Sequence, residues 1–208
     1  ANTDLLLNNG KISVNNSYEG LEGATVTLKG GTIAVKASDD GINAAGGNDS
    51  ESTDGAFGPD AFGEPGGGGD STKFIEITGG TIYVEADGDG IDSNGDIRMT
   101  DGTLVVNGPV DNGNGALDYD GSFTIDGGLF IASGSSGMAM STSDSSSQAS
   151  LSLYFEETQA AGTLINFKNA AGETIASIAP KKEFTHIAVS APNLKVGDTV
   201  TVATGGQD

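Results

Sequence analysis

A five-residue segment that begins with glycine and continues as an apolar, strand-like run recurs five times along this chain. The copies are GKISV (10–14), GTIAV (31–35), GTIYV (80–84), GTLVV (102–106) and GLFIA (128–132). A second glycine follows each copy, and the steps between these glycines are 21, 49, 25 and 22 residues. The long step holds a segment rich in glycine and acids, which we interpret as an insertion over residues 46–70. Short β-rich units of this length cannot bury their apolar faces alone, so they must stack on one another.

The repeats predict an all-β fold, namely a right-handed parallel β-helix of about five rungs over residues 1–150. A β-sandwich is the alternative, but it does not need turn glycines at one phase of a fixed period. From residue 151 the pattern changes to strands separated by turns, which is typical of antiparallel hairpins. We therefore expect residues 151–208 to form a small β-rich cap packed on the helix. Alternation predicts that Ile33, Ile82, Leu104 and Phe130 point inward and that Ala34, Tyr83, Val105 and Ile131 point outward.

The amino-acid composition further limits the functions that are possible for this chain. Of the 208 residues, 29 are acidic and 9 are basic, and a formal charge of -20 would repel nucleic acid and anionic membranes. The absence of cysteine excludes disulfides and thiolate nucleophiles. No apolar run approaches the roughly 20 residues of a membrane helix, so we expect a soluble protein or the mature part of one. The single histidine, His186, alternates with Ile187 and Val189, and we expect it at the surface.

Acidic and amide side chains recur around the second glycine of each repeat. Aligned by these glycines, the preceding residue reads Glu19, Asp40, Asp89, Asn114 and Ser136, and the residue two places after reads Glu22, Asn43 and Asp92, with Asp118 next if one extra residue is allowed. Neighbouring strands lie about 4.8 Å apart, so facing carboxylates would repel by roughly 3–4 kcal/mol at an effective dielectric near 20. Calcium prefers such oxygen ligands. The alternative is that Asp, Asn and Gly simply form turns here.

Three acidic segments and the C-terminal segment carry a resemblance to a known family. SDDGINAAGG (38–47), ADGDGIDSNG (86–95), NGALDYDG (114–121) and NLKVGDTVTVATGG (193–206) resemble the cell-wall-associated, calcium-containing β-helix carbohydrate-binding proteins of clostridia, which are similar to family 9 polysaccharide lyases. The resemblance implies a secreted or cell-surface protein that binds plant cell-wall polysaccharides such as cellulose and pectin (polygalacturonic acid). It also implies calcium ligands at Asp39, Asp40, Asn43, Asp87, Asp89, Asp92, Asn114, Asp118 and Asp120, with Asn48 and Asp49 as further candidates.

Non-catalytic carbohydrate binding is the first functional hypothesis. Because the chain is strongly acidic, we expect calcium to bridge an acidic sugar to the aspartates. Neutral glucan would instead stack on exposed aromatic rings. The candidate sugar-binding residues are Tyr83, Tyr119 and Lys36. We expect a monomer.

Two other functions remain as alternatives. A pectate-type lyase needs calcium and a base, for which Lys36 and Arg98 are candidates. Both residues also fit ordinary cross-strand charge pairs, Lys36 with Glu85 and Arg98 with Glu76. A structural adhesin or stalk is the third hypothesis. We expect binding rather than catalysis.

Overall fold

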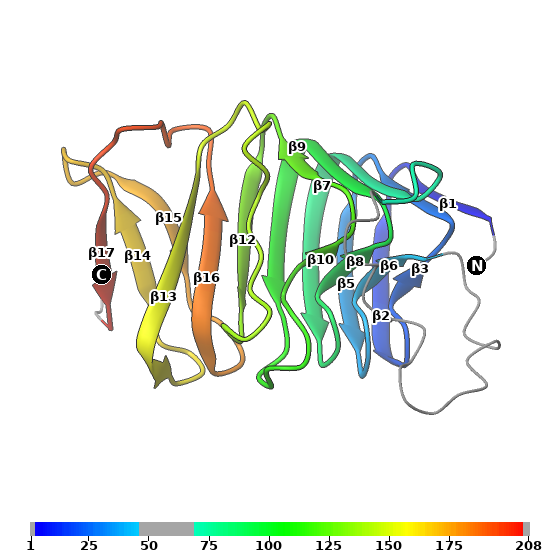
Figure 1. The fold of residues 1–208 in the computed structure, drawn as a ribbon, viewed down its shortest axis with the longest axis horizontal. Coiled ribbons are helices and arrows are strands. Elements are labelled where there is room, and N and C mark those ends of the chain that lie inside the picture. Colours follow the sequence, from blue (N-terminus) through cyan, green and yellow to red (C-terminus); the bar gives the residue numbers. More distant parts are fainter. Residues whose placement is uncertain (1–2, 46–68, 206–208) are drawn as a thin grey trace.

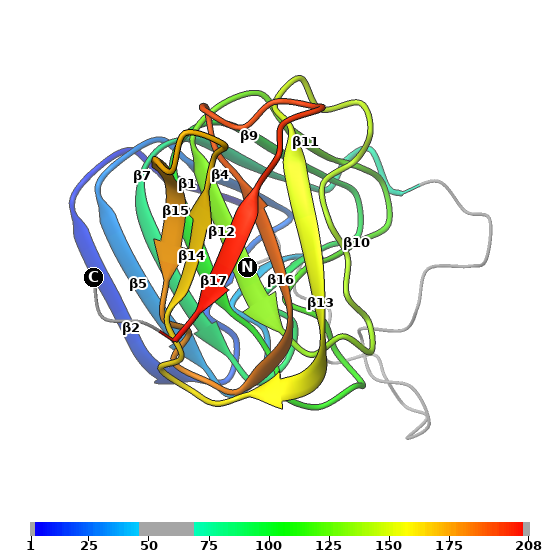
Figure 2. The same ribbon diagram turned by 90° about the vertical axis from the view of Figure 1, so that its left-hand side faces the viewer.

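The structure is a computed structural model that describes residues 3–45 and 69–205. These residues form seventeen strands in three sheets and no helix, which confirms the prediction of an all-β fold. None of them therefore forms a helix that could cross a membrane. Figure 1 shows the repeats stacked at one end of the molecule and the last strands at the other, and Figure 2 shows the molecule from the end formed by the last strands.

The largest sheet contains both apolar strands of each repeat. Successive repeats pair in parallel and in register, so that Val26 lies beside Ile75 and Ile75 beside Ile97. Isoleucine, valine and phenylalanine fit this pleated, buried surface well. The sheet consists of β1 (Asp4–Leu7), β2 (Lys11–Ser17), β4 (Thr25–Leu28), β5 (Thr32–Ala37), β7 (Phe74–Ala86), β9 (Asp96–Asn107), β11 (Phe123–Ile125), β12 (Leu129–Gly134), β13 (Ser150–Gln159) and β16 (Phe184–Ser190).

A second sheet is built from the short strands at the turn glycines. It pairs β3 (Leu21–Glu22), β6 (Ile42–Ala44), β8 (Ile91–Ser93) and β10 (Asp118–Tyr119) in parallel. Ile42 and Ile91 of this sheet are buried in the same apolar cluster as Ile33 and Ile82 of the large sheet. The predicted inward positions Ile33, Ile82, Leu104 and Phe130 are all buried. The extended runs of each repeat therefore enclose one continuous core.

Glycine opens each repeat because the chain turns a corner there. Gly80 and Gly102 have φ angles of 94° and 96°, a region that side chains other than glycine seldom adopt. A Cβ atom on Gly80 would also lie 3.0 Å from the carbonyl oxygen of Gly31, the equivalent residue of the preceding repeat. The stacked repeats thus need glycine at this corner for two separate reasons.

The parallel series ends at β12, which pairs antiparallel with β16, and β13 pairs antiparallel with the other edge of β16. A third sheet of β14 (Ile165–Lys168), β15 (Thr174–Ile178) and β17 (Thr201–Thr204) is also antiparallel. These strands have an apolar core of their own, which includes Phe167 and Phe184. Val105 and Ile131 lie in this second core and are buried, so the expectation that they lie outside is wrong: they point away from the first core, but the last strands cover them.

Candidate functional site

The short second sheet brings one of the two predicted acid-and-amide columns together. Glu22 pairs with Asn43, Asn43 with Asp92, and Asp92 with Asp118, all in register along parallel strands. Only 5% of the Asn43 surface and 7% of the Asp92 surface are exposed. Side chains in register on adjacent parallel strands point to the same face and lie about 4.8 Å apart. Oxygen-bearing side chains of four repeats therefore form one row.

Asp40 and Asp89, one residue before the glycines, are buried and carry hydrogen bonds between repeats. The Asp89 main-chain N–H donates to Oδ1 of Asp40 at 2.7 Å, and the Gly115 N–H donates to Oδ1 of Asp89 at 2.5 Å. Charge-assisted bonds of this kind offset part of the cost of burying a carboxylate. Each aspartate therefore joins its own repeat to the main chain of the next one.

The third turn is aligned differently from the sequence-based expectation. Gly90 donates its N–H to the carbonyl oxygen of Gly115 at 3.0 Å, which places Ala116 beside Gly90 and Gly115 beside Asp89. The expectation that Asn114 lies in the Asp89 column is therefore wrong. Ala116 and Asp118 have the same spacing as Gly90 and Asp92, so no extra residue is needed to bring Asp118 into register.

Asp39 and Asp40 approach the main chain at Gly88. A Cβ atom on Gly88 would lie 2.6 Å from Oδ1 of Asp39 and 2.6 Å from Oδ1 of Asp40. The Gly88 N–H donates to the main-chain carbonyl of Asp39 at 3.1 Å. Glycine at this position therefore allows two carboxylate oxygens to come within reach of the same peptide.

Asn43 provides the observation that bears most directly on a cation. Its Nδ2 donates to Oδ2 of Asp40 at 3.1 Å, whereas its Oδ1 is buried and accepts no hydrogen bond from any residue that the structure describes. A buried oxygen without a donor is costly unless something else satisfies it. Amide and carboxylate oxygens suit calcium. In the described part of the chain no three His, Cys, Asp or Glu side chains meet in one group, so a calcium ion at this turn would need the Asn43 oxygen as well as carboxylates.

Other predicted ligands lie elsewhere. Asp87 is exposed and forms an ion pair with Lys182, with 2.6 Å between Oδ1 and Nζ. Asp120 is exposed, and its main-chain N–H donates to the carbonyl of Ser93 at 3.0 Å. Asn48 and Asp49 lie outside the described residues. The structure therefore groups Asp39, Asp40 and Asn43 at one turn and lines up Asp92 and Asp118 beside Asn43.

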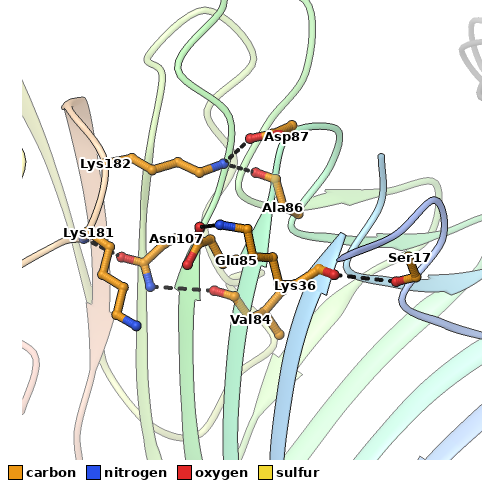
Figure 3. A network of polar contacts seen from close by, with 9 residues as sticks. All are labelled: Ser17, Lys36, Val84, Glu85, Ala86, Asp87, Asn107, Lys181 and Lys182. Carbon is orange, nitrogen blue, oxygen red and sulfur yellow. Dashed lines mark hydrogen bonds and ion pairs between the residues drawn. The ribbon is translucent and has the colours of Figure 1, made fainter. Parts of the chain in front are cut away.

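Two of the predicted sugar-binding residues, Lys36 and Tyr83, lie on the outer face of the large sheet, and Figure 3 shows the contacts of Lys36. Lys36 is in register with Glu85, and the Lys36 Nζ lies 2.6 Å from Oε1 of Glu85. The hydrogen bond and the charge of Glu85 raise the pKa of Lys36. Tyr83, of which 36% is exposed, has the Nζ of Lys181 5.4 Å from its ring centroid. The sequence analysis did not identify Lys181 and Lys182. The only sequence feature that marks these two residues is that they are adjacent lysines in an acidic chain.

Tyr119 and Arg98 do not join this group. Tyr119 packs against the first core, stacks edge-on with Phe123 and donates its hydroxyl to the Ser141 carbonyl at 2.6 Å. Arg98 is in register with Glu76 as predicted, and its Nη2 lies 3.8 Å from Oδ2 of Asp126. Both residues thus have evident structural roles.

His186 is buried, so the prediction of a surface histidine is wrong. Only 2% of it is exposed, and burial lowers its pKa from 6.5 to about 4. Its Nε2 lies 2.6 Å from the Ser152 hydroxyl, and Tyr154 packs on the ring at 4.6 Å between centroids. Alternation along β16 assigned His186 to the opposite face from Ile187, but β16 is covered on both faces.

Fold and site together define a class: an all-β protein with stacked, oxygen-rich turns and an exposed polar sheet face that carries an aromatic ring. A family model described as "Carbohydrate-binding domain-containing protein" matches residues 1–207, and the chain belongs to this family. Comparisons with curated proteins and with solved structures find no match.

Proposed function

We propose that this protein is a non-catalytic binding protein for plant cell-wall polysaccharide, including pectin and cellulose, that holds calcium in its stacked Asp/Asn turns. Membership of a carbohydrate-binding family supports a sugar ligand. The net charge of -20 would repel a polyuronate, and a bound calcium ion would offset this repulsion where the acidic polymer binds.

The buried Oδ1 of Asn43, which accepts no hydrogen bond within the described part of the chain, is the single observation that carries the calcium part of the proposal. Asn43, Asp39 and Asp40 would hold the ion, and Asp92 and Asp118 follow Asn43 in the row. Calcium would neutralise the repulsion between these side chains and supply a positive charge to a sugar carboxylate.

The proposal also includes a right-handed parallel β-helix for the repeats and an extracellular or cell-surface location. The in-register parallel pairs of successive repeats and their single enclosed core support the β-helix. A cell-wall polysaccharide as ligand requires the protein to be outside the cell.

Electrophoresis through native gels that contain polygalacturonate or a neutral cellulose derivative tests the sugar ligand. We expect the polygalacturonate gel to retard the protein more strongly with calcium than with chelator. Equal mobility with and without the polymers would overturn carbohydrate binding. Equal retardation in calcium and chelator would overturn the calcium bridge alone.

Substitution of Asn43 tests the calcium site directly. Asn43→Leu keeps a similar volume and removes the amide oxygen, so we expect it to abolish most of the calcium-induced rise in melting temperature. Asn114→Leu is the matched control, because its turn is aligned differently and Gly115 lies beside Asp89. A calcium response in Asn43→Leu equal to that of the unmodified protein would contradict this site.

The structure gives no specific support for a lyase. A base must lose its proton near the working pH, whereas the neighbouring Glu85 raises the pKa of Lys36. The other candidate base, Arg98, forms an ion pair with Asp126.

A further inference from the structure

The outer face of β2, β5 and β7 carries small and polar side chains and the exposed aromatic ring of Tyr83. Alternate residues of a strand share a face. In one row across the three strands, Ser13 pairs with Ala34 and Ala34 with Tyr83. Ser13 and Ala34 are small and exposed, so the side of Tyr83 that faces them stays open along the row. The rows on either side are polar: Lys11, Thr32 and Thr81 on one side, and Asn15, Lys36 and Glu85 on the other.

Three lysines surround this end of the sheet, although the whole chain has only 9 basic residues. Lys36 pairs with Glu85 and Lys182 with Asp87, so these two charges are balanced. Lys181 is exposed, and its Nζ lies 5.4 Å from the centroid of the Tyr83 ring. Among the described residues no carboxylate forms an ion pair with Lys181. The Lys181 ammonium group therefore places one positive charge, which no described carboxylate balances, beside the Tyr83 ring of a strongly acidic molecule.

The main chain of Lys181 is fixed in place by a buried side chain, as Figure 3 shows. Its N–H donates to Oδ1 of Asn107 at 2.8 Å, and the Nδ2 of Asn107 donates to the Val84 carbonyl at 3.4 Å. Asn107 is 1% exposed. The segment between β15 and β16 is thereby tied to β7 and β9 next to Tyr83, and a preorganised site loses less entropy on binding.

A shallow hollow of about 130 Å³ adjoins this face. Lys36, Ser38 and Asp87 line it together with residues at the end of β2. Its polar groups could receive the hydroxyls of a neighbouring sugar unit, since a few placed polar groups orient ligands in most binding sites.

We propose that Tyr83 and Lys181 form a binding subsite for a uronic acid unit: the sugar ring packs on Tyr83 and its carboxylate pairs with the Lys181 ammonium. Charge-assisted hydrogen bonds are stronger than neutral ones, and lysine recognises anions as a point charge. The subsite rests on the proposed carbohydrate-binding function, but it needs no calcium. It selects acidic over neutral sugar at a place distinct from the Asp/Asn turns.

Calorimetric titration with galacturonic acid oligomers, in calcium and again in chelator, tests the subsite. Lys181→Gln leaves the main-chain bond to Asn107 in place. We expect it to weaken binding about three- to tenfold under both conditions, and to leave binding of cello-oligosaccharide unchanged. Tyr83→Leu should weaken binding of both sugars. Lys195→Gln, an exposed lysine with the same change of net charge, is the matched control and should have no effect.

The outcomes separate this subsite from the proposed function. Asn43→Leu should weaken binding only in calcium, whereas Lys181→Gln should weaken it in both media. If the unmodified protein binds the oligomers and Lys181→Gln binds equally well in both media, the subsite is wrong and the function stands. If the unmodified protein binds neither sugar in either medium, both proposals fail. Equal weakening by Lys195→Gln would reduce the effect to net charge and overturn the subsite.

Discussion

The repeats and the last strands bury their residues in different ways. In the repeats, parallel strands in register stack each residue on its equivalent, so apolar residues stack on apolar ones and oxygen-bearing side chains on oxygen-bearing ones. Beyond β12 the pairing is antiparallel, and a separate core forms mostly from residues outside the repeats, together with Val105 and Ile131. Repetition therefore lets one short sequence pattern build the whole first region. It also places acids such as Asp40 and Asp89 in a buried stack.

The two regions satisfy their buried polar groups in different ways. The buried carboxylates of the repeats accept main-chain N–H groups from the next repeat. The last strands bury His186, whose imidazole is held neutral and bonded to Ser152. Acid should therefore affect the two regions through different groups.

Substitution of a glycine in the repeats should cause the largest loss in the free energy of unfolding. Substitution of a glycine in the last strands should not have such a large effect. A Cβ atom on Gly41 would lie 2.2 Å from Cγ1 of Val84 and 2.5 Å from the Gly90 carbonyl oxygen. We expect Gly41→Ala to lower the free energy of unfolding by about 3 kcal/mol in urea denaturation, because both neighbours are fixed. Gly172 lies at a turn of the last strands where, among the described residues beyond its chain neighbours, no atom comes within 4 Å of an added Cβ, so Gly172→Ala should cost only about 1 kcal/mol for its positive φ. Equal costs would contradict the difference in stacking.

Acid should destabilise the last strands through His186. The folded pKa of about 4 lies below the unfolded value near 6.5, so between these pH values the unfolded chain holds the extra proton. The stabilisation is complete above pH 6.5 and is lost as the pH falls, by up to about 3 kcal/mol near pH 4. Urea denaturation at pH 7.0 and 4.5 should show a larger fall for the unmodified protein than for His186→Gln. Identical falls would mean that His186 does not titrate in this window.

Asp89→Ala tests the carboxylate-to-main-chain bonds of the repeats. It removes the acceptor of the buried Gly115 N–H, so we expect a loss of about 2 kcal/mol in chelator. Calcium should increase this loss if the turns bind the ion cooperatively. No loss in chelator, measured by thermal unfolding, would show that the carboxylate matters only as a calcium ligand.

The repeated side chains made part of this site predictable. Glu22, Asn43, Asp92 and Asp118 carry a visible period, and the register places them in one row. The acceptor role of Asp89 was not predictable, because its donor is a main-chain N–H that has no sequence signal. The shift from Asn114 to Gly115 depends on the path of one turn.

Burial in the last strands was equally hidden. His186 and Ile131 obey alternation, but alternation distinguishes two faces and does not say that both are covered. Lys182 reaches Asp87 from 95 residues away in sequence, and no local pattern indicates such a contact. The residues whose burial or contacts the sequence repeats do not predict are therefore those at which the two regions meet.

The ion pair between Asp87 and Lys182 should have the smallest effect, although it joins the two regions. The Asp87 side chain is 67% exposed, and exposed ion pairs contribute less than about 1 kcal/mol. We expect Asp87→Asn to change the free energy of unfolding by less than this, and any change to vanish at 0.5 M salt because the pair is screened. Asp89, two residues further along, supplies the contrast, since its bond is buried and should persist in salt. A loss of several kcal/mol in Asp87→Asn would mean that this ion pair, and not only the apolar contact of Val105 and Ile131, holds the last strands to the repeats.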